Sequence, residues 1–145
     1  MKGFVTIFGL LITTLFANAQ LVPPQGEGSW KISLNKITVL TSSESNELLN
    51  IKKIKSADWK KNGYLEVIYK ETTPGNWLHS LQFTDEAGNQ LLVKDSVTAA
   101  KIPIAVLRKL FAGKKQIKIY MVINPPNPMM MAPSRMLHLG TLRLP

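Results

Sequence analysis

KNGYLEVIYKETTPGNWLHSLQF, residues 61–83, contains two strand patterns, each preceded by a turn signal. Asn62-Gly63 precedes the first pattern, over 64–70, and Pro74-Gly75 precedes the second, over 77–83. Asn-Gly tolerates the positive φ angles that tight hairpin turns require. In both segments large apolar residues recur at every second position, which places them on one face of a strand. The stretch therefore predicts two successive strands, each with one buried face.

The same alternation occurs in five further segments, at 30–39, 48–55, 90–94, 117–123 and 136–144. In the first segment the parity of the apolar positions shifts by one at Asn35-Lys36, which predicts a β-bulge there. The segment 48–55 fits a helical turn as well as a strand. The alternation thus predicts about seven short strands.

One segment follows a helical period instead. Ile104, Leu107 and Phe111 lie three and four residues apart, and Gly113 follows them as a stop signal. Pro103 stands where the first turn of a helix accepts proline. The spacing predicts one short helix near residues 103–112.

Short strands with frequent turns, and one helix before the last two strands, predict an all-β fold, an antiparallel β-sandwich. The strand count and the helical crossover resemble those of an immunoglobulin-like domain. A small antiparallel β-barrel is the alternative. The 145-residue chain has room for one hydrophobic core. We expect residues 30–145 to form this single domain, with residues 20–29 as an extended leader.

The first nineteen residues have the pattern of a signal peptide. Lys2 precedes an apolar run over 3–16, and Ala17-Asn18-Ala19 supplies the small residues of a cleavage site. The run is shorter than the roughly 20 apolar residues of a membrane span, although a retained anchor is the alternative. We expect cleavage after Ala19, no transmembrane span in the mature chain, and export to a periplasm or to the outside of the cell.

The sequence offers little for catalysis. It has no cysteine, which excludes disulfides, thiolate metal sites and cysteine nucleophiles. No GxSxG, GxxxxGK[ST] or HExxH motif occurs. An enzyme would have to use His79 or His138 as its general base, with a carboxylate brought close by the fold. We therefore expect a binding protein and not an enzyme.

Charge is concentrated at the C-terminal end. The net charge is +9, and no acidic residue follows Asp95. Five basic residues flank the expected last hairpin and are predicted to form a stripe beside Tyr120: Lys114, Lys115, Lys118, Arg135 and Arg143. In an exported protein such a stripe favours an acidic envelope component or a protein partner, and no nucleic acid is expected.

Between the last two expected strands lies a connection rich in proline and methionine, over 124–134. It contains Pro125, Pro126, Pro128, Met129, Met130 and Met131. Methionine side chains are flexible and apolar, which suits an adaptable contact surface. Prolines lower the conformational freedom that binding would remove. This loop is the predicted contact site for an envelope or extracellular partner.

Methionine and histidine also allow a metal-binding alternative. A periplasmic carrier of Cu(I) would use Met129, Met130, Met131, Met136 and His138, because Cu(I) prefers soft thioether ligands and thiolates are absent. Residues two apart on a strand point to the same face, so Met136 and His138 would lie together. The M-x-H spacing is similar, in reversed order, to the H-x-M motif of secreted copper-carrier domains.

Overall fold

A computed structural model describes residues 28–72 and 75–145. The predicted signal peptide over 1–19 and nearly all of the predicted leader lie outside the described residues. The elements follow in this order: β1 (Ser29–Leu34), β2 (Ile37–Ser42), β3 (Ile51–Lys53), α1 (Ser56–Lys60), β4 (Tyr64–Lys70), β5 (Leu78–Thr84), β6 (Gln90–Asp95), β7 (Ala99–Pro103), α2 (Ile104–Leu110), β8 (Gln116–Asn124) and β9 (Arg135–Arg143).

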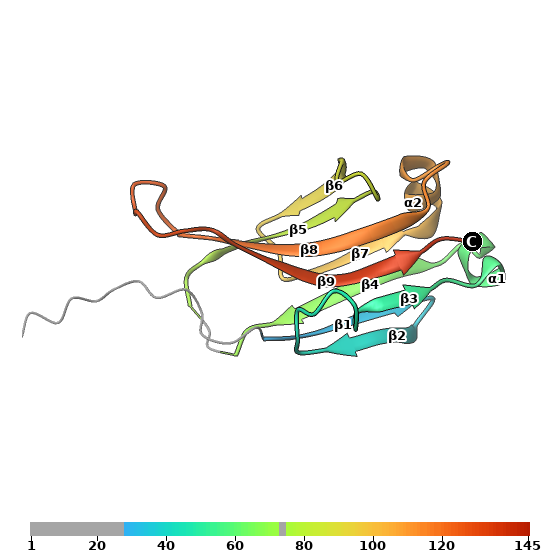
Figure 1. Cartoon of the computed structure of the whole chain (residues 1–145), viewed down its shortest axis with the longest axis horizontal. Coiled ribbons are helices and arrows are strands. Elements are labelled where there is room, and N and C mark those ends of the chain that lie inside the picture. Colours follow the sequence, from blue (N-terminus) through green and yellow to red (C-terminus); the bar gives the residue numbers. More distant parts are fainter. Residues whose placement is uncertain (1–27, 73–74) are drawn as a thin grey trace, which may run out of the picture.

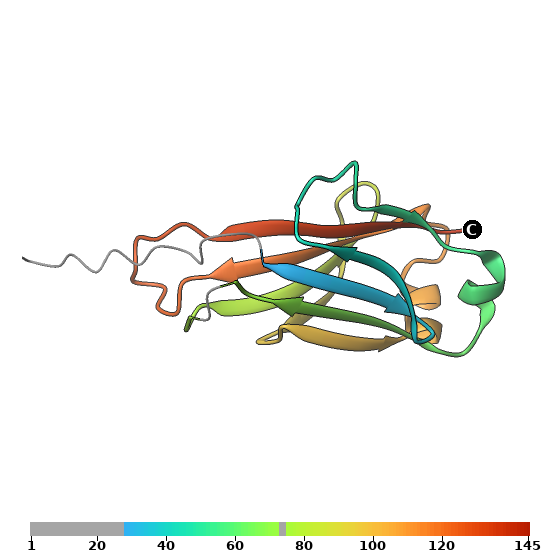
Figure 2. The ribbon, with the colours of Figure 1, turned by 90° about the horizontal axis from the view of Figure 1, so that it is seen from below.

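Two sheets pack face to face, as Figures 1 and 2 show. One has four strands in the order β2-β1-β4-β7, and the other has five in the order β3-β9-β8-β5-β6. The predicted β-sandwich is confirmed, and the barrel alternative is wrong because each sheet ends in two edge strands. The helix α2 leads from β7 in one sheet to β8 in the other, and confirms the predicted helix.

The core between the sheets is built from the alternating apolar positions. Ile117, Ile119, Met121 and Ile123 of β8 are fully buried, whereas the residues between them face outward. One buried hydrogen bond joins the two sheets: the indole nitrogen of Trp30 on β1 donates to the Leu139 carbonyl of β9, 2.6 Å away. The core therefore fixes the β8–β9 hairpin firmly against the opposite sheet.

The predicted single strand over 30–39 is wrong. Asn35 and Lys36 have φ angles of 53° and 69° and form a tight turn between β1 and β2, which pair antiparallel. A two-residue turn shifts the parity of the apolar positions as a bulge would, and asparagine tolerates the left-handed region. The chain therefore reverses at the point where the sequence predicted only a bulge.

Three further elements differ from the prediction. Of the segment 48–55 only Ile51–Lys53 is a strand, β3, which pairs parallel with β9. The short helix α1 and the strand β7 were not predicted. No helix in the described part of the chain is both long enough and apolar enough to cross a membrane.

Candidate functional site

The methionines and prolines lie at the tip of the longest hairpin of the described chain. β8 and β9 have nine residues each, and the connection between them extends past the other labelled strands in Figure 1. We call residues 124–134 the Met/Pro loop. The side chains of Met129 and Met131 are 87% and 103% exposed, and Met130 is half-buried. Pro125 and Pro126 are half-buried, and Pro128 is exposed. Two large apolar side chains are thus presented to solvent.

Hydrogen bonds brace the Met/Pro loop. The Oγ of Ser134 lies 2.6 Å from the Oδ1 of Asn124 and closes the base of the loop. Within it, Asn127 accepts from the amide of Met129 through its side chain, at 2.9 Å, and from the amide of Met130 through its carbonyl, at 2.9 Å. Such an Asx turn holds the backbone locally. The methionine side chains therefore project from an ordered turn.

An exposed apolar strip continues from the Met/Pro loop onto the outer face of the five-stranded sheet. Met136 on β9 is 55% exposed and lies opposite Val122 of β8, which also faces outward. Leu78 on β5 is 50% exposed and lies opposite Asn124, diagonal to Val122. Directly opposite residues have Cβ atoms about 4.5–5.5 Å apart and diagonal neighbours lie about 7–8 Å apart, so these side chains are close to one another. Leu78 was not predicted as part of the site, because its neighbours on the surface are set by the order of strands in the sheet.

The predicted basic stripe is divided between the two ends of the hairpin. Arg143 lies opposite Gln116, and Arg135 lies opposite Ile123 at the Met/Pro loop. Lys118 lies five positions along β8 from Ile123, the residue opposite Arg135, which is about 17 Å at the rise of an antiparallel strand. Lys114, Lys115, Lys118 and Arg143 thus gather at the α2 end, and only Arg135 lies beside the methionines.

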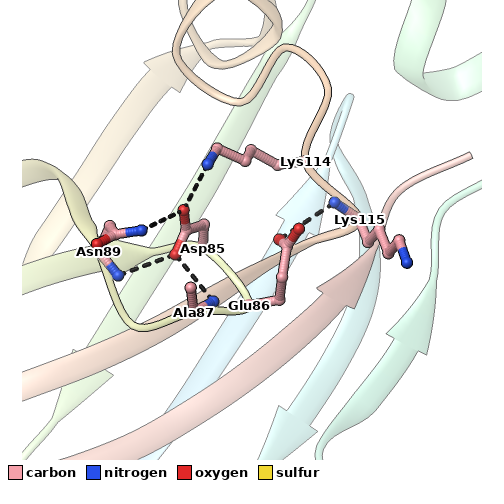
Figure 3. Close-up of polar contacts among 6 residues, drawn as sticks. All are labelled: Asp85, Glu86, Ala87, Asn89, Lys114 and Lys115. Atoms are coloured by element: carbon pink, nitrogen blue, oxygen red, sulfur yellow. Dashed lines mark hydrogen bonds and ion pairs between the residues drawn. The ribbon is translucent and has the colours of Figure 1, made fainter.

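Lys114 and Lys115 are also engaged within the protein (Figure 3). The ammonium of Lys114 lies 2.7 Å from the Oδ2 of Asp85, a residue without solvent exposure, and the amide of Lys115 donates to Glu86. Asp85 also accepts hydrogen bonds from the amides of Ala87 and Asn89. The hydrogen bond from Lys114, followed by those from the side chain and the amide of Asn89, holds the pKa of Asp85 far below its usual range, and Asp85 raises the pKa of Lys114. The cluster joins the β5–β6 turn to the segment after α2.

Met136 and His138 share the outer face of β9, which confirms the predicted orientation. His138 is nevertheless only 4% exposed, and its Nε2 lies 2.8 Å from the Thr141 hydroxyl. The ring packs edge-on against Tyr120, with 5.4 Å between the centroids. Burial lowers the pKa of His138 and raises that of Tyr120. The remaining nitrogen, Nδ1, is buried without a hydrogen-bond partner.

His79 has the carboxylate partner that an acid–base role would require. Its Nε2 lies 2.5 Å from the Oε1 of Glu71, and both side chains are about one-tenth exposed. The ring of Tyr69 packs beside the imidazole, with 6.0 Å between the centroids. This buried pair joins the start of β5 to the end of β4 near the base of the Met/Pro loop.

Comparison with known proteins yields no relative. No family model, no curated protein and no solved structure matches the chain.

Proposed function

We propose that this protein is an exported, non-catalytic binding module that contacts a protein partner through the Met/Pro loop and the apolar strip beside it. The observation that carries the proposal is the exposure of Met129 and Met131 at the tip of a braced hairpin. Export is proposed from the signal-peptide pattern over 1–19.

Physical chemistry supports a protein partner at this surface. A contiguous group of exposed apolar side chains costs solubility and typically marks an interaction site. Methionine adapts its shape to a partner at little energetic cost. The Met/Pro loop, Met136 and Leu78 together offer such a group, and a rigid sandwich holds it in place.

Site-specific photo-crosslinking tests the proposal. A photoreactive amino acid is placed at position 129 or 131, and at Val106 on α2 as the matched control, because Val106 is also exposed but lies at the opposite end of the sandwich. We expect one partner to be crosslinked from 129 and 131 and not from 106. Equal crosslinking from all three positions, or none from the loop, contradicts the proposal.

Two double substitutions, one in the Met/Pro loop and one at the far end of the sandwich, provide a second test. Met129→Ser with Met131→Ser is expected to abolish capture of the crosslinked partner without changing the unfolding midpoint, because both side chains are exposed. Ile37→Ser with Val106→Ser removes exposed apolar side chains at the far end of the sandwich and is expected to leave capture intact. Capture that survives the loop substitutions would refute this role of the methionines.

The Cu(I) carrier remains a second candidate because of one observation. The unpartnered Nδ1 of His138 lies on the same face of β9 as Met136. Competition against a chromogenic Cu(I) chelator tests it: a carrier removes Cu(I) from the chelator, and Met136→Leu weakens the competition. Met121→Leu is the matched control, because Met121 is buried in the core. A protein that leaves the chelator complex intact is not a Cu(I) carrier.

A further inference from the structure

A pocket lies on the four-stranded sheet at the α2 end, opposite to the Met/Pro loop. Its volume is about 450 Å³, within the range of small-molecule sites. Three parts of the chain build it: the β1–β2 turn, the segment between α1 and β4, and the paired strands β4 and β7. We call it the lysine pocket, and define it by Lys36, Lys61, Asn62, Tyr64, Glu66 and Lys101.

The lysine pocket carries a positive charge that the protein itself leaves largely unneutralised. It contains three ammonium groups and one carboxylate, that of Glu66. Lys61 lies 3.6 Å from Asp58 and remains mostly exposed, and within the described residues Lys36 and Lys101 form no ion pair. Cations gathered in a concave site attract an anionic ligand more strongly than isolated surface lysines. A ligand that complements this charge carries at least one negative charge.

Tyr64 gives the lysine pocket an apolar wall. The side chain is 48% exposed, and the ammonium of Lys101 lies 4.6 Å from the centroid of the ring. The electron-rich face of an aromatic ring attracts cations and also the weakly positive C–H groups of a ligand. A pyranose ring presents such C–H groups on its faces, whereas a bare inorganic anion has none.

Arg108 on α2 fixes the position of the segment between α1 and β4, which forms one side of the lysine pocket. Its guanidinium donates to the carbonyl oxygen of Trp59 at 2.7 Å, and to the Oδ1 of Asn62 at 3.0 Å. Because the Oδ1 of Asn62 accepts from Arg108, the amide group is oriented, and its NH₂ can donate a hydrogen bond to a ligand. A segment that is fixed before binding loses little conformational entropy when a ligand binds.

Glu66 narrows the class of ligand further. Its carboxylate lies on β4 opposite Lys101 of β7 and can only accept hydrogen bonds at neutral pH. It would repel a compact anion such as phosphate but would accept hydrogen bonds from hydroxyl groups. A ligand with an acidic group, hydroxyl groups and an apolar ring face satisfies all of these side chains together. We infer that the lysine pocket binds an acidic sugar, such as one uronic acid residue of an acidic polysaccharide.

Titration of the ¹⁵N-labelled protein with D-glucuronate tests this inference by NMR. We expect saturable shifts of amide signals confined to residues of the lysine pocket. D-Glucose, which lacks the carboxylate, and inorganic phosphate, which lacks the ring and hydroxyl groups, are each expected to bind at least about fivefold more weakly. The absence of saturable shifts with glucuronate, or equal binding of glucose or phosphate, overturns the inference.

Variants of two exposed residues locate the binding. Tyr64→Ala and Lys101→Gln are each expected to weaken glucuronate binding about fivefold or more, because they remove the stacking surface and one cation. Lys94→Gln removes another exposed lysine, from β6 in the other sheet, and should leave binding unchanged. The dispersion of the NMR spectrum reports whether each variant is folded. Folded variants at Tyr64 and Lys101 that bind glucuronate as the unaltered protein does overturn the assignment.

Discussion

The ammonium of Lys114 lies 2.7 Å from the carboxylate of Asp85, which has no solvent exposure. The two residues stand on different connections, so their ion pair ties the β5–β6 turn to the start of β8. Asp85 also caps its own turn, because its Oδ1 accepts from the amides of Ala87 and Asn89. These donors stabilise the ionised form of the buried carboxylate in the folded protein.

Asp85→Asn is therefore expected to lower the free energy of unfolding clearly at pH 7. The amide would place an NH₂ group against donors and leave the Lys114 ammonium without its counter-ion. Glu86→Gln is the matched control, since Glu86 lies in the same turn but is exposed, and it accepts a hydrogen bond from the amide of Lys115. Urea unfolding measures the free energy of unfolding of both variants. An Asp85→Asn protein as stable as Glu86→Gln would contradict the structural role.

The same pair sets a dependence on pH. The pKa of Asp85 is lowered in the folded protein, so its stabilising contribution is complete above the pKa of the unfolded chain, near 3.8. The contribution falls as acid protonates the carboxylate. The stability difference between the unaltered protein and Asp85→Asn should therefore be full at pH 7 and shrink below about pH 4. A difference that stays constant down to pH 2 would refute the linkage.

Much of the fold could be predicted because apolar residues at every second position report burial directly. The β8–β9 hairpin and the buried face of β8, from Ile117 to Ile123, follow from that pattern alone. The turn at Asn35-Lys36 could not be separated from a bulge, since both shift the parity by one. The strand β7 has a weak pattern, AAKIP, and its conformation depends on pairing with β4.

The candidate sites were less predictable, because they combine residues from distant parts of the chain. Exposure of Met129 and Met131 follows from a proline-rich connection, which cannot pack as regular structure. The pairing of Lys114 with Asp85 spans 29 residues and removes a predicted contact residue from the free surface. The lysine pocket draws on three separate segments, none of which carries a binding motif. Such sites depend on strand order, which local patterns do not specify.

Trp30→Phe is expected to destabilise the protein by about 1–3 kcal/mol. Leu139 lies at the register shift of β9, where no residue of β8 stands opposite, and its carbonyl accepts from the Trp30 indole. Phenylalanine fills most of the volume but cannot donate, so a buried carbonyl loses its partner. Trp77→Phe is the control, since in the described structure the indole of Trp77 donates no hydrogen bond. If urea unfolding showed the same decrease in the free energy of unfolding for both variants, the importance of the Trp30 hydrogen bond would be refuted.

Gly140→Ala should cost about 1–3 kcal/mol through overpacking. A Cβ at this position would lie 2.8 Å from the Cδ1 of Ile32 and 2.8 Å from the Cδ2 of Leu40, both in the core. Ile32→Val deletes one of these atoms. In the double variant we therefore expect a favourable coupling energy, so that the losses of the two single variants do not add. Additive losses in a double-mutant cycle would show that the clash is relieved elsewhere.

Binding through the Met/Pro loop should depend weakly on salt. Apolar contacts do not weaken as ionic strength rises, whereas ion pairs between exposed charges are screened. Arg135 alone stands beside the methionines, and the other cations of the predicted stripe lie at the α2 end. We expect retention of the crosslinked partner to change less than about threefold between roughly 0.05 and 0.5 M NaCl. A loss of tenfold or more would instead assign the contact to the lysines and arginines.

His138 should make the fold sensitive to mild acid. Burial lowers its pKa below the ordinary value of 6.5, so the unfolded chain binds a proton at a higher pH than the folded protein. Stability is then unaffected above about pH 7 and falls as the pH drops through 6.5 towards the folded pKa. His138→Gln removes this loss, and its stability should decline less between pH 7 and 5. NMR titration of the imidazole checks the cause directly, and a His138 midpoint at or above 6.5 would contradict it.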